Sequence, residues 1–467
     1  MPNSNKIHFE ISERKVLLRI FDVCIVLLSL YVVGIIFKFN YFQFSTTNFY
    51  WTFVLGLYLN VFGTVFEMYN LQVASNQIQV VKSIVLTAST TVLVYLLTPI
   101  YTPVLPSNRL QIVFFYIAIF SALFIWRLLY VAFFASNRFT KKVILICDKD
   151  QLKELVMGLQ NADPHYKILG YMNSDALNNR NNEHDIPSYL TRIESSNLES
   201  FVMKHAVSEV VVASQNTAGI TTELYNQLIH LLEKGYMIKE YTQVYEALTQ
   251  RIPVQYVARD FYRYFPFSRS NQNHLYLVFI RTIDLVVGLV GLAISFLLMP
   301  IILVGNFLAN KGDLLYTQER VGKNGVVFKI VKFRTMIKNA EANGAVFTTL
   351  NDSRVTPFGK ILRKTRLDEF PQFYNIIKGE MSVIGPRPER PIFVNEIAET
   401  MPFYETRHII KPGLTGWAQV NYAYGESLDD SLIKLQYDLY YIKHRSIFLD
   451  INICIKTLST ILFYRGQ

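Results

Sequence analysis

The chain has 467 residues, of which 51% are hydrophobic, and its formal net charge is +10. A composition this apolar, with a positive mean hydropathy, excludes an ordinary soluble enzyme and is typical of a membrane protein of two or three domains. The three cysteines, Cys24, Cys147 and Cys454, lie far apart, so neither a disulfide framework nor a zinc-ligand spacing is predicted.

Apolar segments open the chain at residues 16–37, 49–66, 84–100 and 112–134. Each is long enough to span or nearly span a bilayer as a helix, so residues 1–140 are predicted to form a four-helix transmembrane bundle. Basic residues precede the first segment and follow the fourth, which places both ends in the cytoplasm. Arg127 lies near the cytoplasmic end of the fourth segment, and we expect it to reach the interface by snorkelling.

Residues 141–265 alternate between short strands and helices, which predicts a small α/β domain. Strands are expected at 143–147, 168–172, 207–213 and 237–240, with helices at 151–160 and 222–233. The first strand runs into Cys147-Asp148-Lys149-Asp150, where a dinucleotide-binding turn would need glycines. We therefore expect this domain to be degenerate and to lack a working cofactor site.

A second membrane element begins at Arg281-Thr282-Ile283-Asp284 and continues without charge over residues 285–304. Arg281 and Asp284 are one helical turn apart and are expected to pair. Pro300 predicts a bend at Met299-Pro300. The segment is either a kinked spanning helix or a re-entrant helix at about 279–309 that enters and leaves on the cytoplasmic face, and the residues alone leave both open.

The interval 311–366 is strongly basic, with twelve Lys or Arg against four Asp or Glu. It contains Arg320 and an alternating stretch, 327–333, that predicts a strand with its cations on one face and Lys332 and Arg334 near its end. No nucleic-acid-binding motif is present, so nucleic acid is not an expected partner. A basic interval after an apolar segment suits anionic lipid or a diphosphate substrate.

Two adjacent carboxylates, Asp368 and Glu369, follow this interval. A short helix is predicted over 372–378, with Pro371 in its first turn and Gly379 after its end, so Asp368 falls at or near the N-cap. Asp368 could serve only as a cap. The same position could instead hold it, ionised, beside a phosphate bound at the helix N-terminus.

A carboxylate can attack phosphorus when it is ionised, near the phosphate and helped by cations. Asp368 meets these requirements, and Glu369 points away from it by about 100° on a helix. Divided roles follow, with Asp368 as nucleophile and Glu369 as a Mg²⁺ ligand. The candidate diphosphate contacts are Arg363, Arg366 and Arg387, the last of which lies in the turn Gly385-Pro386-Arg387-Pro388.

Ordered motifs in this half of the chain carry a resemblance. Thr365-x-Leu367-Asp368-Glu369-x-Pro371-Gln372, Lys378-Gly379-Glu380-Met381-Ser382 and Gly385-Pro386-Arg387-Pro388 resemble the bacterial sugar transferase family, the monotopic polyprenyl-phosphate phosphoglycosyltransferases. The resemblance runs from about residue 281 to the C-terminus. It implies that residues 266–467 form an α/β catalytic domain with a re-entrant helix, and that the middle domain is Rossmann-like. The family's usual Ser-Pro at the helix break is Met299-Pro300 here.

The resemblance also implies an activity. Asp368 would attack the β-phosphate of a UDP-sugar and release UMP, and undecaprenyl phosphate would then accept the phosphosugar, as the first step of exopolysaccharide, capsule or O-antigen synthesis. Glu369 would bind Mg²⁺, and Arg387 with its flanking prolines would lie near the nucleotide. Arg320, Lys332 and Arg334 match family segments that lie close to the active site, so the resemblance adds them to the candidate substrate contacts. The implied location is the bacterial inner membrane with the active site on its cytoplasmic face, and large members imply glucose or galactose. A homo-oligomer stays open.

Other classes stay in view. A membrane glycosyltransferase would release UDP, but the chain has Asp429-Asp430 and no Asp-x-Asp element. A non-catalytic scaffold or nucleotide sensor would depend on the middle domain, whose turn lacks the glycines. Identification of the released nucleotide separates the three classes.

Overall fold

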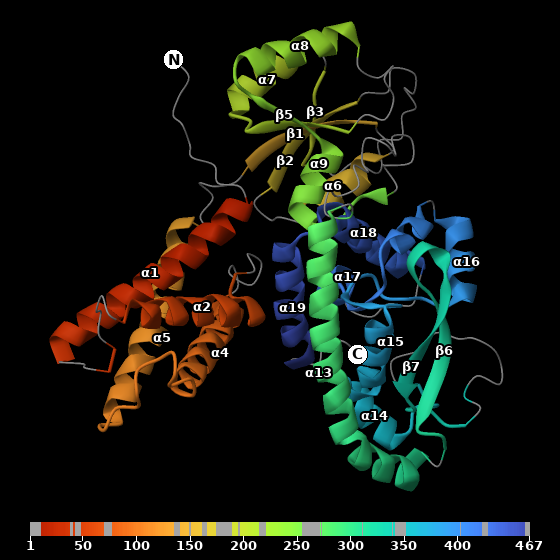
Figure 1. The fold of residues 1–467 in the computed structure, drawn as a ribbon. Coiled ribbons are helices and arrows are strands. Elements are labelled where there is room, and N and C mark those ends of the chain that lie inside the picture. The colour runs from red at the N-terminus through yellow and green to blue at the C-terminus, as the bar shows by residue number, and fades with distance from the viewer. Residues whose placement is uncertain are drawn as a thin grey trace. The chain divides into compact units, whose positions relative to one another are not determined.

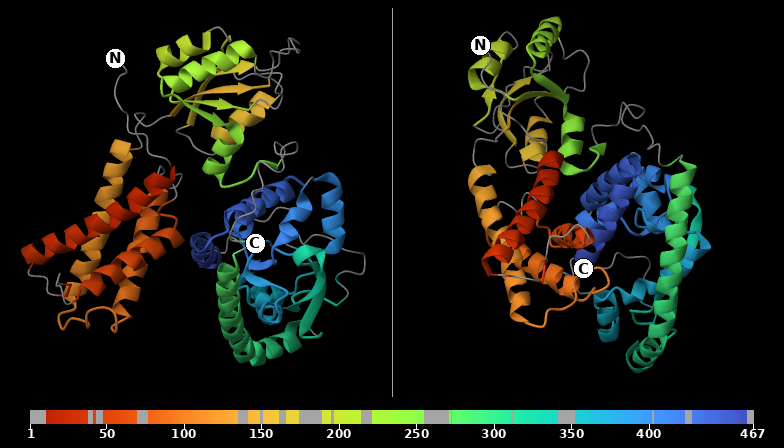
Figure 2. Two further views of the ribbon diagram at one scale, coloured as in Figure 1. Left: turned by 45° about the horizontal axis from the view of Figure 1, so that its top comes forward. Right: turned by 60° about the vertical axis from the view of Figure 1, so that its left-hand side comes forward.

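The computed structural model describes residues 11–37, 41–42, 48–69, 77–134, 141–148, 151–160, 166–173, 189–194, 197–213, 221–254, 271, 273–310, 312–338, 340, 352–401, 403–422 and 428–462. Two compact units make up the chain, Met1–Val244 and Tyr245–Gln467. Figures 1 and 2 show their elements.

Apolar helices form the first part of the N-terminal unit. They are α1 (Ile11–Phe37), α2 (Phe49–Val65), α4 (Gln77–Leu96) and α5 (Leu110–Phe134). Within them, Val16–Phe37 and Leu110–Tyr130 are long and apolar enough to cross a membrane, while Phe49–Val65 and Val80–Leu96 are shorter apolar helices. Their shared core includes fully buried Val26, Leu55 and Ile119. The prediction of a membrane protein with apolar N-terminal helices is confirmed.

Arg127 on α5 does not snorkel. Its Nη2 donates to Asp22 Oδ2 of α1 at 2.7 Å, and both side chains are buried. The prediction was wrong because an opposite charge lies on the neighbouring helix, and a buried charge is stabilised better by a close partner than left without one. A contact between residues so far apart in sequence has no local signal.

The second part of the N-terminal unit is an α/β layer. Its five-stranded parallel sheet has the order β3-β2-β1-β4-β5, and Figure 1 shows helices beside it. The order is that of a doubly wound sheet. The strands are β1 (Lys141–Cys147), β2 (Tyr166–Asn173), β3 (Thr191–Arg192), β4 (Glu209–Val212) and β5 (Met237–Glu240), and the helices are α6 (Leu152–Gln160), α7 (Leu198–His205) and α8 (Thr222–Glu233).

The predicted strands and helices of this layer are confirmed, and β3 and α7 were not predicted. Central β1 is buried from Val143 to Cys147, as expected for a parallel strand covered on both faces. The helix α9 (Tyr241–Thr249) crosses the division between the units. Residues just after it belong with the C-terminal unit, since the Ile252 amide donates to Gln436 O at 3.1 Å. The predicted boundary at 265 lies outside the described residues.

The C-terminal unit begins with the long helix α13 (His274–Gly305), which continues as a π-helical turn over Asn306–Asn310. Pro300 lies inside the helix without ending it. In Figures 1 and 2 the C-terminal part of α13 turns aside from the direction of its first part. The segment His274–Asn310 is long and apolar enough to cross a membrane.

One face of α13 is small or polar and packs on the rest of the unit. Its buried residues, spaced mostly three or four apart, include Asp284, Gly291 and Ser295, whereas Leu289 and Leu297 on other faces are 60% and 77% exposed. A Cβ on Gly291 would lie 2.4 Å from a ring carbon of Phe373. This glycine therefore permits close packing of α13 on the next helices.

The motifs of residues 365–388 lie on short elements, several of which pack against α13. The strands β6 (Leu315–Val321) and β7 (Val327–Phe333) form an antiparallel pair, and β8 (Ser382–Ile384) pairs in parallel with β9 (Gly413–Thr415). The helices are α14 (Pro357–Lys364), a 3-10 helix (Leu367–Gln372), α15 (Phe373–Lys378), α16 (Pro391–Thr400), a 3-10 helix (Tyr404–Ile409), α17 (Trp417–Asn421), α18 (Leu428–His444) and α19 (Ile447–Leu462).

The α18 and α19 helices contribute much of the core of this unit. Leu439 and Ile453 are fully buried in it. Asp450, a charged residue within apolar α19, accepts hydrogen bonds from Tyr276 Oη at 2.6 Å and from Tyr441 Oη at 2.7 Å. Two hydroxyl donors therefore satisfy a carboxylate that apolar surroundings would otherwise destabilise.

Candidate active site

The two central carboxylates lie in the turn between α14 and α15. Arg366 adopts a left-handed backbone with φ 58° and turns the chain into the 3-10 helix Leu367–Gln372. Asp368 is the second residue of this helix and caps neither it nor α15 with its side chain. The capping prediction was wrong because the 3-10 helix occupies the place where α15 was expected to begin. Gly379, with φ 91°, ends α15 as predicted.

Asp368 is a buried carboxylate with spare hydrogen-bonding capacity. Its side chain is 8% exposed, and its Oδ1 has no hydrogen-bond partner among the described residues. Burial, followed by the charge of Glu369, raises the pKa of Asp368 to about 6, against the lowering effect of Lys332 and Arg363. At neutral pH the group is still mainly ionised, and one oxygen is available for another partner.

Glu369, next in the chain, has the opposite environment. Arg387 Nη2, Lys332 Nζ and Arg366 Nη1 lie 3.0, 3.3 and 3.8 Å from its Oε1. Burial alone would raise the pKa of Glu369, but these three charges outweigh it and hold the pKa far below the usual range. Glu369 is therefore the permanently charged member of the pair, as the predicted division of roles requires.

Lys332 reaches Glu369 because of its position on β7. Side chains on a strand alternate between its faces, so Lys329 and Lys332 point to opposite sides. Lys329 is exposed, whereas Lys332 is partly buried against Glu369. The predicted strand is confirmed, but the prediction that its cations share one face was wrong, because the two lysines are three positions apart and the period of a strand is two.

Asn375 fixes α15 to β7, and sequence reasoning missed it. Its Nδ2 donates to Lys329 O at 2.8 Å, and its Oδ1 accepts from the Val331 amide at 3.2 Å. The side chain is 1% exposed. A polar residue inside an otherwise apolar short helix was the available signal, since a buried amide needs such partners.

The other predicted cations divide by location. Arg363 on α14 donates through Nε to Thr335 Oγ1 at 3.0 Å, and its charge also lowers the pKa of Asp368. Arg334 instead donates to the backbone and carboxylate of Asp313 at 2.9 and 3.3 Å. The structure thus brings Arg363 to the carboxylates along with Lys332, Arg366 and Arg387, and gives Arg334 a different partner.

The Gly385–Pro388 turn is held by backbone contacts. The Gly385 amide donates to Thr415 O at 2.9 Å, and Pro386 O accepts from the Gly413 amide at 2.8 Å. A Cβ on Gly385 would lie 2.4 Å from Lys411 O, so no larger residue fits this crossing. Gly385 and Pro386 therefore act by shaping the turn that directs Arg387 to Glu369.

Two arginines hold the same turn from outside. Arg320 Nη1 donates to Pro388 O at 3.0 Å. Buried Arg407, which was not predicted, donates through Nη2 to Arg387 O at 3.0 Å and to Asp438 Oδ2 at 2.7 Å. Its partners lie on segments that are distant in the sequence, so no local sequence pattern indicates this role.

Arg281 and Asp284 do not form the expected pair. Arg281 donates through Nη1 and Nη2 to Ile376 O and Ile377 O at 2.7 and 2.6 Å, so it satisfies carbonyls near the C-terminus of α15. Asp284 accepts from Ser382 Oγ at 2.9 Å and from the Val383 amide at 2.8 Å. Both residues join α13 to the segment that carries the site, and Met299 and Pro300 lie farther along the same helix.

The described side chains would supply only part of the coordination of a Mg²⁺ ion. The described residues contain no group of three or more His, Cys, Asp or Glu side chains that could hold a metal. Mg²⁺, however, commonly binds through one or two carboxylates together with substrate phosphates and water. The unsatisfied Oδ1 of Asp368 beside the ionised Glu369 is an oxygen donor set of that type.

Comparison with known proteins shows the family of this chain. The family described as bacterial sugar transferase matches residues 275–464. A UDP-N-acetylgalactosamine-undecaprenyl-phosphate N-acetylgalactosaminephosphotransferase of Aeromonas hydrophila is 40% identical over 47% of this chain and 51% of its own length. A putative undecaprenyl-phosphate N-acetylgalactosaminyl 1-phosphate transferase of Bacillus subtilis is 43% identical over 30% of this chain and 79% of its own length. The chain belongs to the bacterial sugar transferase family.

Similarity to another sugar transferase extends beyond the C-terminal unit. A galactosyl transferase CpsE of Streptococcus agalactiae is 28% identical over 70% of this chain and 72% of its own length. The match to the Aeromonas relative, by contrast, spans about half of that protein. The sugar transferase motifs predicted from the sequence all lie in the region matched by the family.

Proposed function

We propose that this bacterial sugar transferase moves a phosphosugar from a UDP-sugar to undecaprenyl phosphate and so begins the assembly of a surface polysaccharide. The observation that carries the proposal is buried Asp368 with an unsatisfied oxygen, next to Glu369 and its three cations. The names of the relatives supply the substrate class, a UDP-sugar and undecaprenyl phosphate.

In the first step Asp368 attacks the β-phosphorus of the UDP-sugar. The bond from that phosphorus to the oxygen bridging the two phosphates breaks, UMP leaves with that oxygen, and the phosphosugar is joined to Asp368. Lys332, Arg363 and Arg366 surround the carboxylate and would neutralise charge on the phosphates. Glu369, with the substrate phosphates, would hold Mg²⁺, which supplies further neutralisation.

In the second step an oxygen of undecaprenyl phosphate attacks the same phosphorus. The bond to Asp368 breaks, the carboxylate is restored, and the product is undecaprenyl-diphospho-sugar. Ionised Asp368 is a suitable leaving group because its positive neighbours stabilise the charge that returns to it. The arginine of the Gly385–Pro388 turn, Arg387, is assigned to the nucleotide side of the site.

We place α13 in the membrane as a re-entrant helix. The helix is bound to one compact unit along its length, by Asp284 to Ser382 near its start and by Asn310 Nδ2 to Arg334 O at 2.9 Å at its end. If α13 crossed the bilayer completely, its two ends would lie on opposite sides. One of these polar contacts would then have to form on the far side of the bilayer from the rest of the unit. Both ends therefore belong on one side, and the availability of UDP-sugars makes that side the cytoplasmic face of the inner membrane.

The proposal also assigns a role to each of the three predicted domains. The helices α1, α2, α4 and α5 form four spans in residues 1–140, and the parallel-sheet domain of 141–265 acts as a scaffold without a bound dinucleotide. The buried strand β1 ends at Cys147, and Asp148 follows it directly. A carboxylate there would repel pyrophosphate. Residues 266–467 are the catalytic domain.

The identity of the released nucleotide tests the function. Full-length protein in membranes would be incubated with UDP-sugars, a polyprenyl phosphate and Mg²⁺, and the nucleotide products separated by chromatography. UMP release that depends on the sugar nucleotide is expected. Release of UDP would instead establish a glycosyltransferase, and release of neither nucleotide with any UDP-sugar would leave a scaffold.

A further inference from the structure

A cavity of about 620 Å³ lies in the C-terminal unit beside the first part of α13. Asp368 and Glu369 do not line it. Arg281, which lines the cavity, binds the C-terminal carbonyls of α15, whereas the two carboxylates precede the N-terminus of α15. The cavity and the candidate active site therefore lie at opposite ends of α15.

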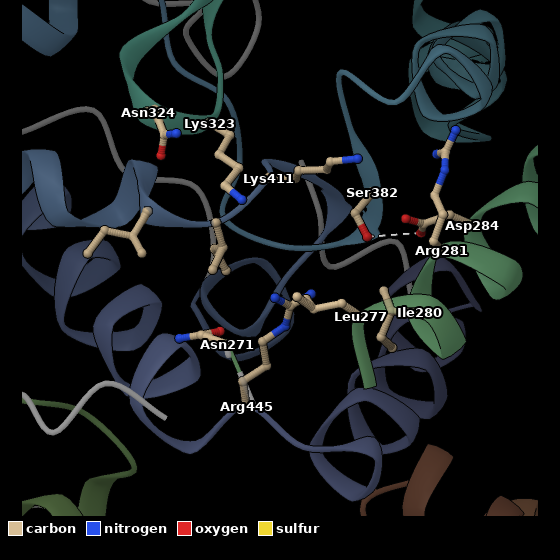
Figure 3. A pocket seen from close by; sticks show the side chains of 12 residues that line it. Asn271, Leu277, Ile280, Arg281, Asp284, Lys323, Asn324, Ser382, Lys411 and Arg445 are labelled. Atoms are coloured by element: carbon tan, nitrogen blue, oxygen red, sulfur yellow. Dashed lines mark hydrogen bonds between the residues drawn. The ribbon is translucent and has the colours of Figure 1, made fainter. Parts of the chain in front are cut away.

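The cavity has an excess of positive charge. Its lining contains four cations from separate segments, and Asp284 is the one carboxylate among these lining residues. Asp284 already accepts two hydrogen bonds, from Ser382 and Val383. Figure 3 shows Lys323 and Arg445 pointing into the cavity from opposite sides. The cationic lining residues are Arg281, Lys323, Lys411 and Arg445.

Two of these cations converge on one point. A Cβ placed on Gly379 would lie 3.5 Å from Arg281 Nη2 and 3.6 Å from Lys411 Nζ. Burial, and then the charge of Arg281, lowers the pKa of Lys411. Both nitrogens lie near the same point beside Gly379, so an anion at that point would be stabilised by both charges.

The lining also has an apolar part, some of which comes from the proposed membrane helix. Leu277 and Ile280 come from α13 and, like Ile409 and Ile410, line the cavity. The neighbouring α13 residue Val278 is 64% exposed. A ligand here would meet both cationic and apolar side chains beside α13, a combination that suits a lipid headgroup at the membrane surface.

We propose that this cavity binds the phosphate of an anionic phospholipid that takes no part in the reaction. An acceptor phosphate has to reach the phosphosugar on Asp368, and a phosphate held among Lys323, Lys411 and Arg445 is at the far end of α15. The bound lipid would fix the first part of α13 at the membrane surface. The inference rests on the proposed membrane placement of α13 and not on the transfer chemistry.

Native mass spectrometry of the full-length protein tests the site. Protein in detergent micelles would be titrated with phosphatidylglycerol or with phosphatidylcholine, and the lipid retained per protein measured. We expect one tightly retained phosphatidylglycerol and at least fivefold weaker retention by the double variant Lys323→Gln, Lys411→Gln. The unaltered protein should retain phosphatidylcholine no better than the double variant retains phosphatidylglycerol.

The matched control removes two other exposed lysines, Lys329→Gln on β7 and Lys360→Gln on α14, and should retain phosphatidylglycerol as the unaltered protein does. Equal loss in both double variants, or equal retention of the two lipids, would overturn the proposal. Neither lipid measurement depends on UMP release. A failure of the proposed transfer reaction would therefore leave the lipid retention unchanged.

A competition arm separates the two sources of lipid phosphate. Undecaprenyl phosphate added to the micelles should leave the tightly bound phosphatidylglycerol in place. One-for-one displacement, together with a raised KM for undecaprenyl phosphate in the Lys323→Gln, Lys411→Gln variant, would assign the cavity to the acceptor and overturn the phospholipid assignment.

Discussion

The cations of the C-terminal unit gather at two places that differ in what neutralises them. At the candidate active site, Lys332 and Arg387 contact Glu369 directly. At the α13 cavity, four cations line the space with one carboxylate, Asp284, which already accepts hydrogen bonds from Ser382 and Val383. The first cluster is organised around two carboxylates of the site itself, whereas the second surrounds a cavity.

The difference indicates two uses of basic residues in one small domain. Where cations surround the built-in carboxylate Glu369, they hold it ionised, while burial and then the charge of Glu369 raise the pKa of Asp368. Where they surround a cavity, they favour an anion from outside. Variants of the two carboxylates test whether the first cluster works as this comparison requires.

The largest effect is expected from Asp368→Asn. An amide is not nucleophilic, so UMP release should fall by about a thousandfold or more. The covalent phosphosugar adduct, measured by intact mass after UDP-sugar is added without acceptor, should disappear. Glu399→Gln, an exposed carboxylate on α16, is the matched control and should keep the adduct. An adduct in Asp368→Asn would reject the nucleophile assignment.

Glu369→Gln should have the next largest effect. It leaves Lys332 and Arg387 facing a neutral group, and the loss of one partner of a buried pair lowers the free energy of unfolding by about 3 kcal/mol. Thermal denaturation in detergent measures this loss. We also expect adduct formation to slow by about a hundredfold and to depend less on Mg²⁺ concentration. Unchanged stability would contradict the buried ion pairs of Glu369, and unchanged Mg²⁺ dependence would reject its proposed role as a metal ligand.

The rate of adduct formation should depend on pH through Asp368. Because its pKa is about 6, the ionised fraction falls roughly tenfold for each pH unit well below that value. The single-turnover rate at pH 5 is therefore expected to be about a tenth of the rate at pH 7. If the rate instead fell only below about pH 4, near the ordinary pKa of aspartate, the result would show that burial does not raise the pKa of Asp368.

The smallest effect is a gain in stability in Asp368→Asn. The folded pKa of Asp368 is raised, so the folded protein binds the extra proton between about pH 4 and pH 6 and loses that stabilisation as pH rises through about 6. The amide carries no charge to bury, and the variant should unfold a few degrees higher at pH 7.5 but not at pH 4.5. A lower melting temperature at pH 7.5 would indicate that the carboxylate stabilises the fold.

Local patterns in the sequence were sufficient for most elements. Alternation predicted β7, glycine predicted the end of α15 at Gly379, and apolar runs predicted the N-terminal helices and α13, because these features depend on neighbours a few residues apart. The residues Asp368 and Glu369 were also found from the sequence, through the order of motifs around them.

The tertiary structure decided which groups meet. Arg127 pairs with Asp22, and Arg281 binds carbonyl oxygens at the end of α15 instead of pairing with Asp284. Glu369 receives cations from β7 and from the turn that carries Arg387. These contacts join residues tens of positions apart, and no local period encodes them. The sequence by itself determined the family, the helices and the two carboxylates, while packing decided that one carboxylate is neutralised and the other keeps an unsatisfied oxygen.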